Sequence, residues 1–375
     1  MRRRLRKVGL GLLAIGWLGA AALGVLAPQV FRLAREGFPA PVWPAPGSFV
    51  TVAGVAVPAD PPRGAAPPDA ALARFRDSGG RALLVDRGGT LQIEAYGPGI
   101  GRDTRLNSYS MVKSLVGALA LRAVAEGRIA SLDARLTGLV GPEAPDLTLR
   151  EVLTMTSGLM LAGEPPMETM EKSLEDAGFS PFGPVARLHA YGIEPLLPGL
   201  RIDPAARGRF QYQSANTALV GLAVERAWGR PLPDLLSEQI WAPAGAAAAD
   251  WRKVPAGDGA SAWCCLYARA IDWLRVSRYL MENGTPDAPF LPDALWRAFV
   301  LPDLPGAARR QGAYGLHLRH DVLDRAGQPV AGPFAYMMGH GGQIAYLLPG
   351  QDAIVVRFGA QAQLLHSTLY EVLAP

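Results

Sequence analysis

The sequence has very little cysteine. Only two cysteines occur in 375 residues, and they stand side by side as Cys264 and Cys265. Neighbouring cysteines cannot form a disulfide framework, and without a matching cluster of histidines or further cysteines they do not make a zinc site. A disulfide between the two is an alternative in an oxidising compartment. We expect instead two small, buried, apolar side chains.

The chain also lacks a basic surface and a metal-ligand cluster. Five of its 37 lysines and arginines fall within residues 1–7, and the remaining 32 nearly match the 33 acidic residues. A body of balanced charge is not expected to bind nucleic acid. His317 and His320 lie close together in the sequence, but no third ligand accompanies them, so we predict no metal site.

The N-terminus predicts a membrane anchor. Residues 1–7 form a basic segment, and residues 8–27 form an uncharged run of a length that can cross a bilayer. Basic residues stay in the cytoplasm, so we expect a single-pass inner-membrane protein with its catalytic domain in the periplasm. A cleaved signal peptide is the alternative, because Ala20–Ala22 resembles a cleavage site. A buried core helix is disfavoured by the leading arginines.

Proline marks the next segment. Residues 28–68 contain "PAPVWPAPGSF" and "ADPPRGAAPPD", which predict an extended tether. Within it, residues 48–57 indicate either a strand or an arm packed on the body. We place the folded domain at residues 69–375.

Hairpin signals stand at both ends of that domain. Residues 81–97 carry two apolar runs around Arg87-Gly88-Gly89, and residues 343–359 repeat the pattern before a closing helix. Between them the pattern is helical: residues 214–229 and 264–284 have helical apolar spacing, and Thr148 with Glu151 forms a capping box. We predict an α+β fold, with an antiparallel sheet from both chain ends, flanked by helices and interrupted by a helical region.

Lysine is scarce as well, which singles out Lys113. The chain has only four lysines, and Lys113 follows Ser110 by three residues at the start of an apolar helix that ends at Gly127. Residues three apart share a helix face, and helix N-terminal N–H groups favour a developing anion. A desolvated lysine has a lowered pKa and can activate a serine hydroxyl. Coincidence remains an alternative for one Ser-x-x-Lys pair.

Two further motifs follow in order. Tyr212-Gln213-Ser214 lies in "RFQYQSANTALVG", and His340-Gly341-Gly342 lies in "MGHGGQIAYLLPG". Together with "SYSMVKS" and "LTMTSGL", they make the chain resemble the serine β-lactamase and penicillin-binding-protein superfamily. Within it, the chain looks most like the class C-type β-lactamase-related hydrolases, including esterases and 6-aminohexanoate-dimer hydrolases. The resemblance implies a β-lactamase/transpeptidase-like fold.

The resemblance also implies roles for these residues. Ser110 would be the nucleophile, Lys113 its base, and Tyr212 a partner in proton transfer. The backbone N–H groups of Ser110 and Gln343 would form the oxyanion hole. The substrate would be bound by the positions Ser214, His340, Gly341 and Gly342. Other interpretations are an aromatic lid for Tyr212, a helix cap for Ser214 and an ordinary strand histidine for His340.

One departure from the family pattern guides the choice of substrate. His340 stands where the family has a lysine, and a histidine carries no fixed positive charge near pH 7. We therefore expect hydrolysis of a small-molecule ester or amide through an acyl-enzyme, without a cofactor. A β-lactamase or D-amino-acid peptidase acting on cell-wall material is the first alternative. A membrane-anchored binding module without catalysis is the second.

Overall fold

A computed structural model describes residues 21, 23–37, 49–64, 69–160, 180–310, 312–359 and 366–373. Its main feature is a seven-stranded antiparallel sheet in the order β11-β12-β13-β14-β15-β2-β3. The strands are β2 Gly80–Arg87, β3 Thr90–Tyr96, β11 Ala313–Gly315, β12 Leu318–Leu323, β13 Gly332–Gly339, β14 Gln343–Leu348 and β15 Ala353–Gly359. The first two come from the early part of the chain and the others from its end, which confirms the predicted sheet.

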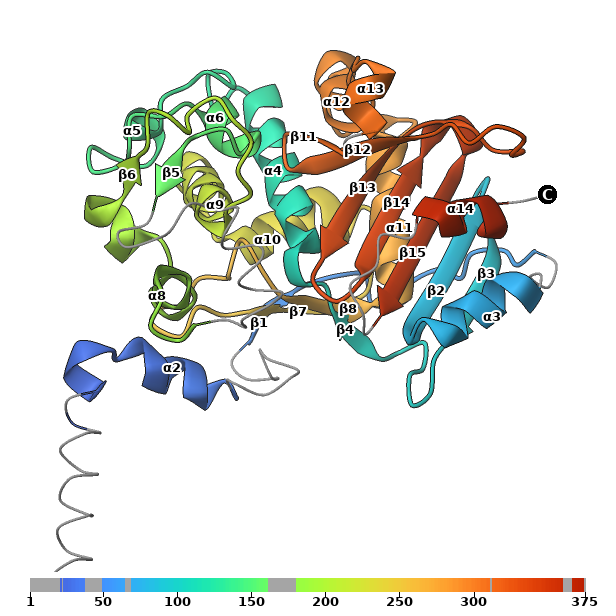
Figure 1. The fold of residues 1–375 in the computed structure, drawn as a ribbon, viewed down its shortest axis with the longest axis horizontal. Helices are drawn as coiled ribbons and strands as arrows, with labels where there is room; N and C mark the ends of the chain where they lie inside the picture. The colour runs from blue at the N-terminus through green and yellow to red at the C-terminus, as the bar shows by residue number, and fades with distance from the viewer. Residues whose placement is uncertain are drawn as a thin grey trace, which may run out of the picture.

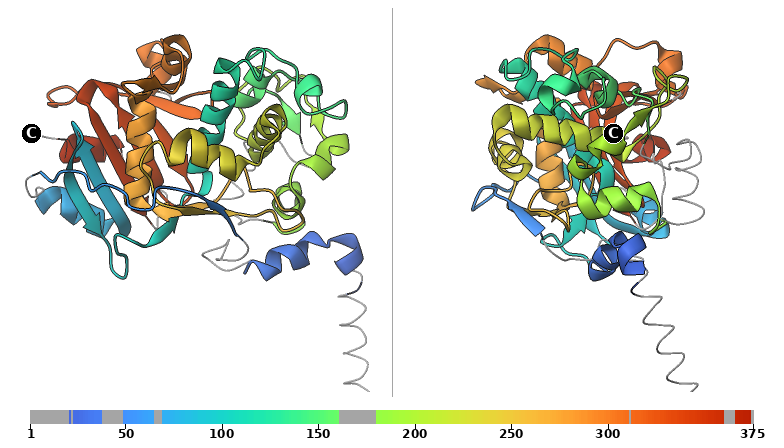
Figure 2. Two further views of the ribbon diagram at one scale, coloured as in Figure 1. Left: turned by 180° about the vertical axis from the view of Figure 1, so that it is seen from behind. Right: turned by 90° about the vertical axis from the view of Figure 1, so that its left-hand side faces the viewer.

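Helices cover both faces of this sheet (Figures 1 and 2). Helix α11, Ala270–Met281, packs on β14, β15 and β2, whereas α3, Asp69–Asp77, and α14, His366–Val372, lie on the opposite face. Each face has its own apolar core: the larger core extends from the α11 face into the helical region, and the smaller one lies under α3 and α14. The sheet is therefore buried on both sides.

The helical region lies beside the sheet, as Figure 1 shows. Its helices are α4 Val112–Ala125, α5 Leu136–Leu139, α6 Leu149–Leu153, α8 Pro184–Tyr191, α9 Ser214–Trp228 and α10 Leu232–Leu236, and α12 Asp293–Val300 and α13 Gly306–Arg310 follow α11. Two short antiparallel strand pairs are also present. Strand β5 Leu159–Met160 pairs with β6 Arg201–Ile202, and β9 Gly284–Thr285 pairs with β10 Ala288–Pro289. The capping box of Thr148 and Glu151 is present at the start of α6, as predicted.

A second sheet corrects one predicted helix. Residues 266–269 form a strand, β8 Leu266–Arg269, and the helix begins only at Ala270. Strand β8 lies between β7, Ala249–Arg252, and β4, Arg105–Asn107, so its backbone groups pair on both sides. Helical apolar spacing did not reveal this pairing, because both partner strands lie outside residues 264–284. The outer strand β1, Phe49–Val52, pairs with β7.

The expected membrane anchor is contradicted. Within the described ranges, no helix is long and apolar enough to cross a membrane, so the prediction of a single-pass inner-membrane protein with a periplasmic domain is wrong. Residues 1–20 and 22, most of the predicted span, lie outside the described residues. The next helix, α2 Gln29–Arg35, carries Arg32 and Arg35 and packs against α8 through Leu33.

Two elements of the segment predicted as a tether contact the body. Helix α2 contacts α8, and β1 extends the smaller sheet. Of this segment, residues 38–48 and 65–68 lie outside the described residues. The boundary that we placed at residue 69 stays a prediction.

Helix α4 joins the two halves of the molecule. It contacts α9, α10 and α12, and eleven of its fourteen residues are buried. The 3₁₀ turn Tyr109–Met111 that precedes it contacts β13 and β14. Gly117 lets the chain before β12 approach this helix, because a Cβ there would lie 2.8 Å from His317 Cβ and 2.9 Å from Leu316 O.

We expect Gly117→Ala to lower the free energy of unfolding by up to about 2 kcal/mol. Alanine favours a helix by about 1 kcal/mol, but forcing a methyl group against backbone atoms costs about 1–3 kcal/mol. Denaturant unfolding of the wild type and the variant measures this change in the free energy of unfolding.

Gly138→Ala is the matched control. Gly138 also lies inside a helix, α5, and a Cβ there would have no atom within 4 Å. This variant should gain about 0.5–1 kcal/mol from helix propensity. Equal stabilisation by both substitutions would contradict the close packing of α4.

Candidate active site

The structure brings Ser110 and Lys113 together at the start of α4. Ser110 lies in the 3₁₀ turn, half-buried, and Lys113 lies in the first turn of the α-helix. The Lys113 Nζ donates to Ser110 Oγ at 2.8 Å and to the carbonyl oxygen of Trp263 at 2.7 Å. The amine is thus held between the serine hydroxyl and a backbone acceptor from the loop between β7 and β8.

The surroundings of Lys113 favour its neutral form. Its side chain is 2% exposed, and burial lowers the pKa of its amine below the usual 10.5. Tyr212 acts in the opposite direction, whereas the nearby charge of Arg319 lowers the pKa further. No carboxylate forms an ion pair with Lys113 anywhere in the described ranges. A lysine so placed can accept a proton closer to neutral pH than an exposed one.

Backbone strain surrounds this pair. Tyr109, directly before Ser110, has a φ of 46°, and Cys265, whose N–H donates to the Tyr109 carbonyl, has a φ of 75°. Met155 and His317 also have positive φ values, 54° and 66°. Such conformations are costly for residues other than glycine and gather at functional sites. Here they belong to segments that pack around the start of α4.

Tyr212 reaches the site from the segment before α9. The Gln211 N–H donates to the Met155 carbonyl at 2.8 Å, and the Gln213 N–H donates to Met155 Sδ at 3.4 Å. The "LTMTSGL" block thus fixes the backbone on both sides of Tyr212. The Lys113 Nζ lies 5.1 Å from the centre of the Tyr212 ring, within the range of a cation–π contact.

The surroundings of Ser214 give less support to a role at the site. It is the first residue of α9, and its hydroxyl has no hydrogen-bond partner among the residues that the structure describes. It therefore does not bond Lys113 here, and it does not cap the helix. Asn216, one turn further, is buried, and its Oδ1 accepts from Ser157 Oγ at 2.7 Å.

The His340-Gly341-Gly342 motif forms the turn between β13 and β14. Gly341 and Gly342 have φ values of 75° and 79°, which require glycine. Gly339, just before the turn, is so close that a Cβ would lie 3.2 Å from Ser110 N. His340 is exposed, with its ring 5.6 Å from that of Tyr109. The turn thus borders Ser110, as the motif order implied.

Three groups at the site were missed by sequence reasoning. The Trp263 carbonyl holds Lys113, and the Trp263 indole N–H donates to His189 Nε2 at 3.3 Å. The Arg319 guanidinium lies 5.4 Å from the Tyr212 ring and 5.6 Å from the Tyr314 ring. The contacts of Trp263 with Lys113 and of Arg319 with Tyr212 join residues more than 100 positions apart, so no local signal in the sequence could reveal them.

The cysteines and the paired histidines are buried. Cys264 and Cys265 are buried as expected, but the structure joins them in a disulfide, the alternative that the sequence disfavoured. Burial lowers the pKa values of His317 and His320 to about 3, so both rings are neutral above that pH. His317 Nδ1 lies 2.9 Å from the Leu153 carbonyl, which ties this histidine to α6.

Comparisons with known proteins bear on the family and the fold. The β-lactamase family profile matches residues 69–365. No curated protein matches the sequence. Among solved structures, a candidate 6-aminohexanoate-dimer hydrolase from Bacillus anthracis is 19% identical, with 86% of this chain and 88% of that chain covered and a TM-score of 0.68.

Two other structures are similar in fold. A D-stereospecific amidohydrolase from Streptomyces sp. is 18% identical, with 81% and 95% of the two chains covered and a TM-score of 0.58. EstCE1, a hydrolase with promiscuous acyltransferase activity, is 17% identical with the same coverage and the same TM-score. At these identities the likeness establishes the fold.

We expect the pKa of the Lys113 amine to lie below 10.5. Burial penalises the ammonium form, so the amine should lose its proton as the pH rises through a lowered value. NMR of protein labelled with ¹⁵N-lysine measures this directly, because only four lysines contribute signals. The Lys113→Met variant identifies the resonance, and a midpoint at or above 10.5 would refute the desolvated setting.

Proposed function

The chain belongs to the β-lactamase family, and from this membership and the site geometry we propose that it is a serine hydrolase that cleaves an ester or a small amide through an acyl-enzyme on Ser110. The observation that carries the proposal is the 2.8 Å contact between the buried Lys113 Nζ and Ser110 Oγ. A serine needs an adjacent base to become a nucleophile, and a desolvated lysine is such a base.

The first half-reaction follows from this contact. Neutral Lys113 takes the proton of Ser110 Oγ while the oxygen attacks the substrate carbonyl carbon. The carbonyl oxygen becomes an oxyanion, which we assign to the backbone N–H groups of Ser110 and Gln343. Tyr212 passes a proton to the leaving alcohol or amine, and the carbon–leaving-group bond breaks. The acyl group is then bonded to Ser110 Oγ.

The second half-reaction returns the enzyme to its starting state. A water molecule attacks the acyl carbon while the deprotonated Tyr212 hydroxyl takes up its proton, and Lys113 returns the proton that it took from Ser110. The acid leaves, and Ser110 Oγ recovers a proton. Residues that act as base in one step act as acid in the next, and Lys113 and Tyr212 lie close enough together to share this work.

A row of aromatic rings supports an apolar group in the substrate. The ring centre of Tyr212 lies 6.1 Å from that of Tyr314, which lies 5.1 Å from that of Phe210. Phe210 is 46% exposed, so the row extends from Lys113 to the surface. An ester with an aromatic leaving group or an apolar acyl group would lie against these rings.

A second candidate is favoured by Arg319. Its guanidinium lies over the Tyr212 ring and brings a fixed positive charge to the site that His340 does not. A substrate carboxylate is the complementary group. This observation supports a β-lactamase or D-amino-acid peptidase as the alternative, with Ser214, His340, Gly341 and Gly342 at the substrate in either case.

Ser110→Ala should abolish turnover of p-nitrophenyl esters by at least about 10³-fold, because the nucleophile is lost. Lys113→Arg should lose a similar factor, because a guanidinium keeps its proton. Lys253→Arg is the control, since Lys253 lies at the surface beside Asp258. Release of p-nitrophenol, measured beside nitrocefin hydrolysis, checks both variants.

The outcomes separate the candidates. Ester or amide turnover that exceeds nitrocefin turnover supports the proposal, whereas fast nitrocefin hydrolysis with negligible esterase activity supports the β-lactamase alternative. A fluorophosphonate probe should label Ser110, identified by peptide mass spectrometry. Absence of labelling and of all turnover would point to a binding module that retains the fold.

Tyr212→Phe should lower kcat for the same esters by about 10²-fold or more, the usual contribution of a proton-transfer group. Tyr314→Phe is the matched control, because Tyr314 is the neighbouring ring beside Arg319. Steady-state kinetics of both variants decide the role of the hydroxyl. Equal losses in the two would favour the aromatic-lid interpretation of Tyr212.

A further inference from the structure

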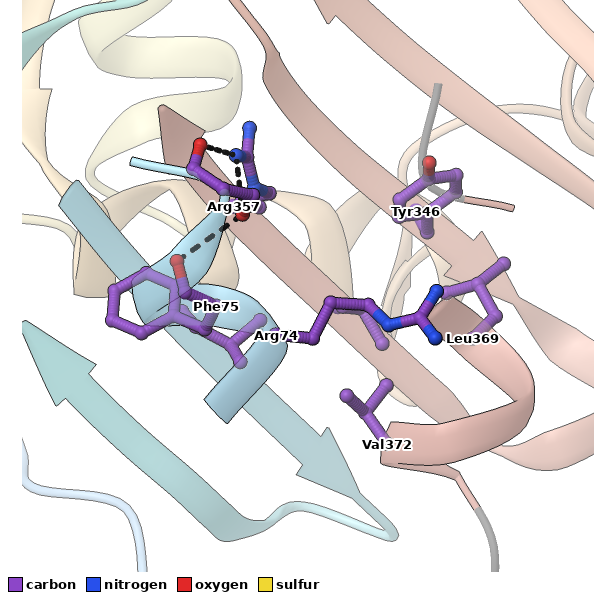
Figure 3. A pocket seen from close by; sticks show the side chains of 9 residues that line it. Arg74, Phe75, Tyr346, Arg357, Leu369 and Val372 are labelled. Atoms are coloured by element: carbon purple, nitrogen blue, oxygen red, sulfur yellow. Dashed lines mark hydrogen bonds between the residues drawn. The ribbon is translucent and has the colours of Figure 1, made fainter. Parts of the chain in front are cut away.

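Arg357 of β15 is buried directly behind the His340-Gly341-Gly342 turn. It is 2% exposed, and its Nη1 donates to the Gly342 carbonyl at 2.9 Å. Its Nη2 donates to the carbonyl and the hydroxyl of Ser78, both at 3.1 Å. Arg357 lines the pocket drawn in Figure 3, together with Phe75 of α3 and with Leu369 and Val372 of α14.

This charge has no carboxylate partner. Burial lowers the pKa of Arg357, and no ion pair forms between Arg357 and any residue in the described part of the chain. Arg252, another fully buried arginine, pairs instead with Glu36. Arg357 is held by carbonyl and hydroxyl oxygens alone, at the C-terminal end of α3, where the helix dipole is negative. Such an arrangement is costly, so it calls for a function.

The backbone makes room for the guanidinium. Strand β15 has an irregular register between Phe358 and Gly359, and a Cβ on Gly359 would collide with Arg357 Nη1. Gly359 also exchanges two hydrogen bonds with the Gln343 side chain, at 3.0 and 3.1 Å. The same Gln343 Nε2 donates to the His340 carbonyl at 2.8 Å. Side chains thus hold the turn at both His340 and Gly342.

The Gly342 carbonyl and the Gln343 N–H belong to one planar peptide group. In a trans peptide the two point in opposite directions, so fixing the carbonyl fixes the N–H. A charged donor on the carbonyl also polarises the group and strengthens the hydrogen bond that its N–H can donate. Gln343 N–H is the group that we assigned to the oxyanion hole.

We propose that Arg357 is a positioning residue, whose guanidinium orients and polarises the Gly342–Gln343 peptide group toward the oxyanion formed at Ser110. The inference rests on the proposed hydrolytic function. Arg357 acts through this peptide and does not touch the reacting atoms. It acts on the transition state, where the oxyanion exists, rather than on substrate binding.

The proposal is tested with two variants, Arg357→Met and Arg357→Lys. Their kinetics are compared with those of a control variant, Arg309→Met. Arg309 of α13 is the matched control: it is 6% exposed, has no ion pair with a described residue, and donates to the Pro302 carbonyl away from the turn. We expect Arg357→Met to lower kcat for p-nitrophenyl esters by about 10- to 100-fold, less than the loss of an oxyanion donor itself. KM should stay within about twofold, and Arg309→Met should keep its kcat.

Two further readouts separate positioning from simple destabilisation. The pH midpoint of kcat should be unchanged in Arg357→Met, because Lys113 is untouched, and Arg357→Lys should recover part of kcat by restoring a charged donor. Equal losses of kcat in Arg357→Met and Arg309→Met, at matched thermal stability, would overturn the proposal.

Crystal structures of the same two variants make the test independent of substrate. The Gly342–Gln343 peptide group should turn or shift in Arg357→Met and keep its orientation in Arg309→Met. An unchanged peptide group in Arg357→Met would overturn the proposal. If the group moves but the wild-type protein hydrolyses no ester, amide or β-lactam, the positioning stands and the proposed function fails.

Discussion

The site depends on the burial of one amine. Lys113 lies within α4, with its Nζ between Ser110 Oγ and the Trp263 carbonyl. An ammonium ion in such a place loses its hydration, so the neutral amine is favoured. The carbonyl that holds it lies on the loop between β7 and β8, and β8 is fixed by pairing with β4, shortly before Ser110. The smaller sheet therefore positions both ends of the contact.

The same constraint explains the close packing around α4. Gly117 and Gly339 leave no space for a side chain, and Tyr109 and Cys265 adopt costly backbone angles. Each brings backbone close to the start of the helix, so that Ser110, Lys113 and the turn at His340 meet. Strain at such a site has to be offset by stability elsewhere, and the two apolar cores on the faces of the main sheet provide it.

The sequence predicted the parts of the site whose signal is local. Ser110 and Lys113 share one helical turn, and the capping box and both hairpins depend on neighbouring residues. Trp263, Arg319 and Arg357 act through contacts with distant backbone or rings, which leave no local pattern. Residues 266–269 were misassigned to a helix for the same reason, because their strand exists only through pairing with distant partners. The N-terminal anchor was inferred from the hydropathy of residues 8–27 and from the basic residues before them.

The different chemistry of arginine and lysine gives a physical reason for the single lysine at the site. Arginine keeps its proton under nearly all conditions, so it serves where a fixed charge is needed: beside the Tyr212 ring in Arg319 and behind the turn in Arg357. Lysine gives up its proton when it is desolvated, so a lysine is the cation that can become a base. Stabilising an oxyanion requires a group that stays charged, whereas activating a serine requires a group that can lose its own proton and accept another. In the proposed reaction the two demands are met by different residue types, an arginine behind the turn and a lysine beside the serine.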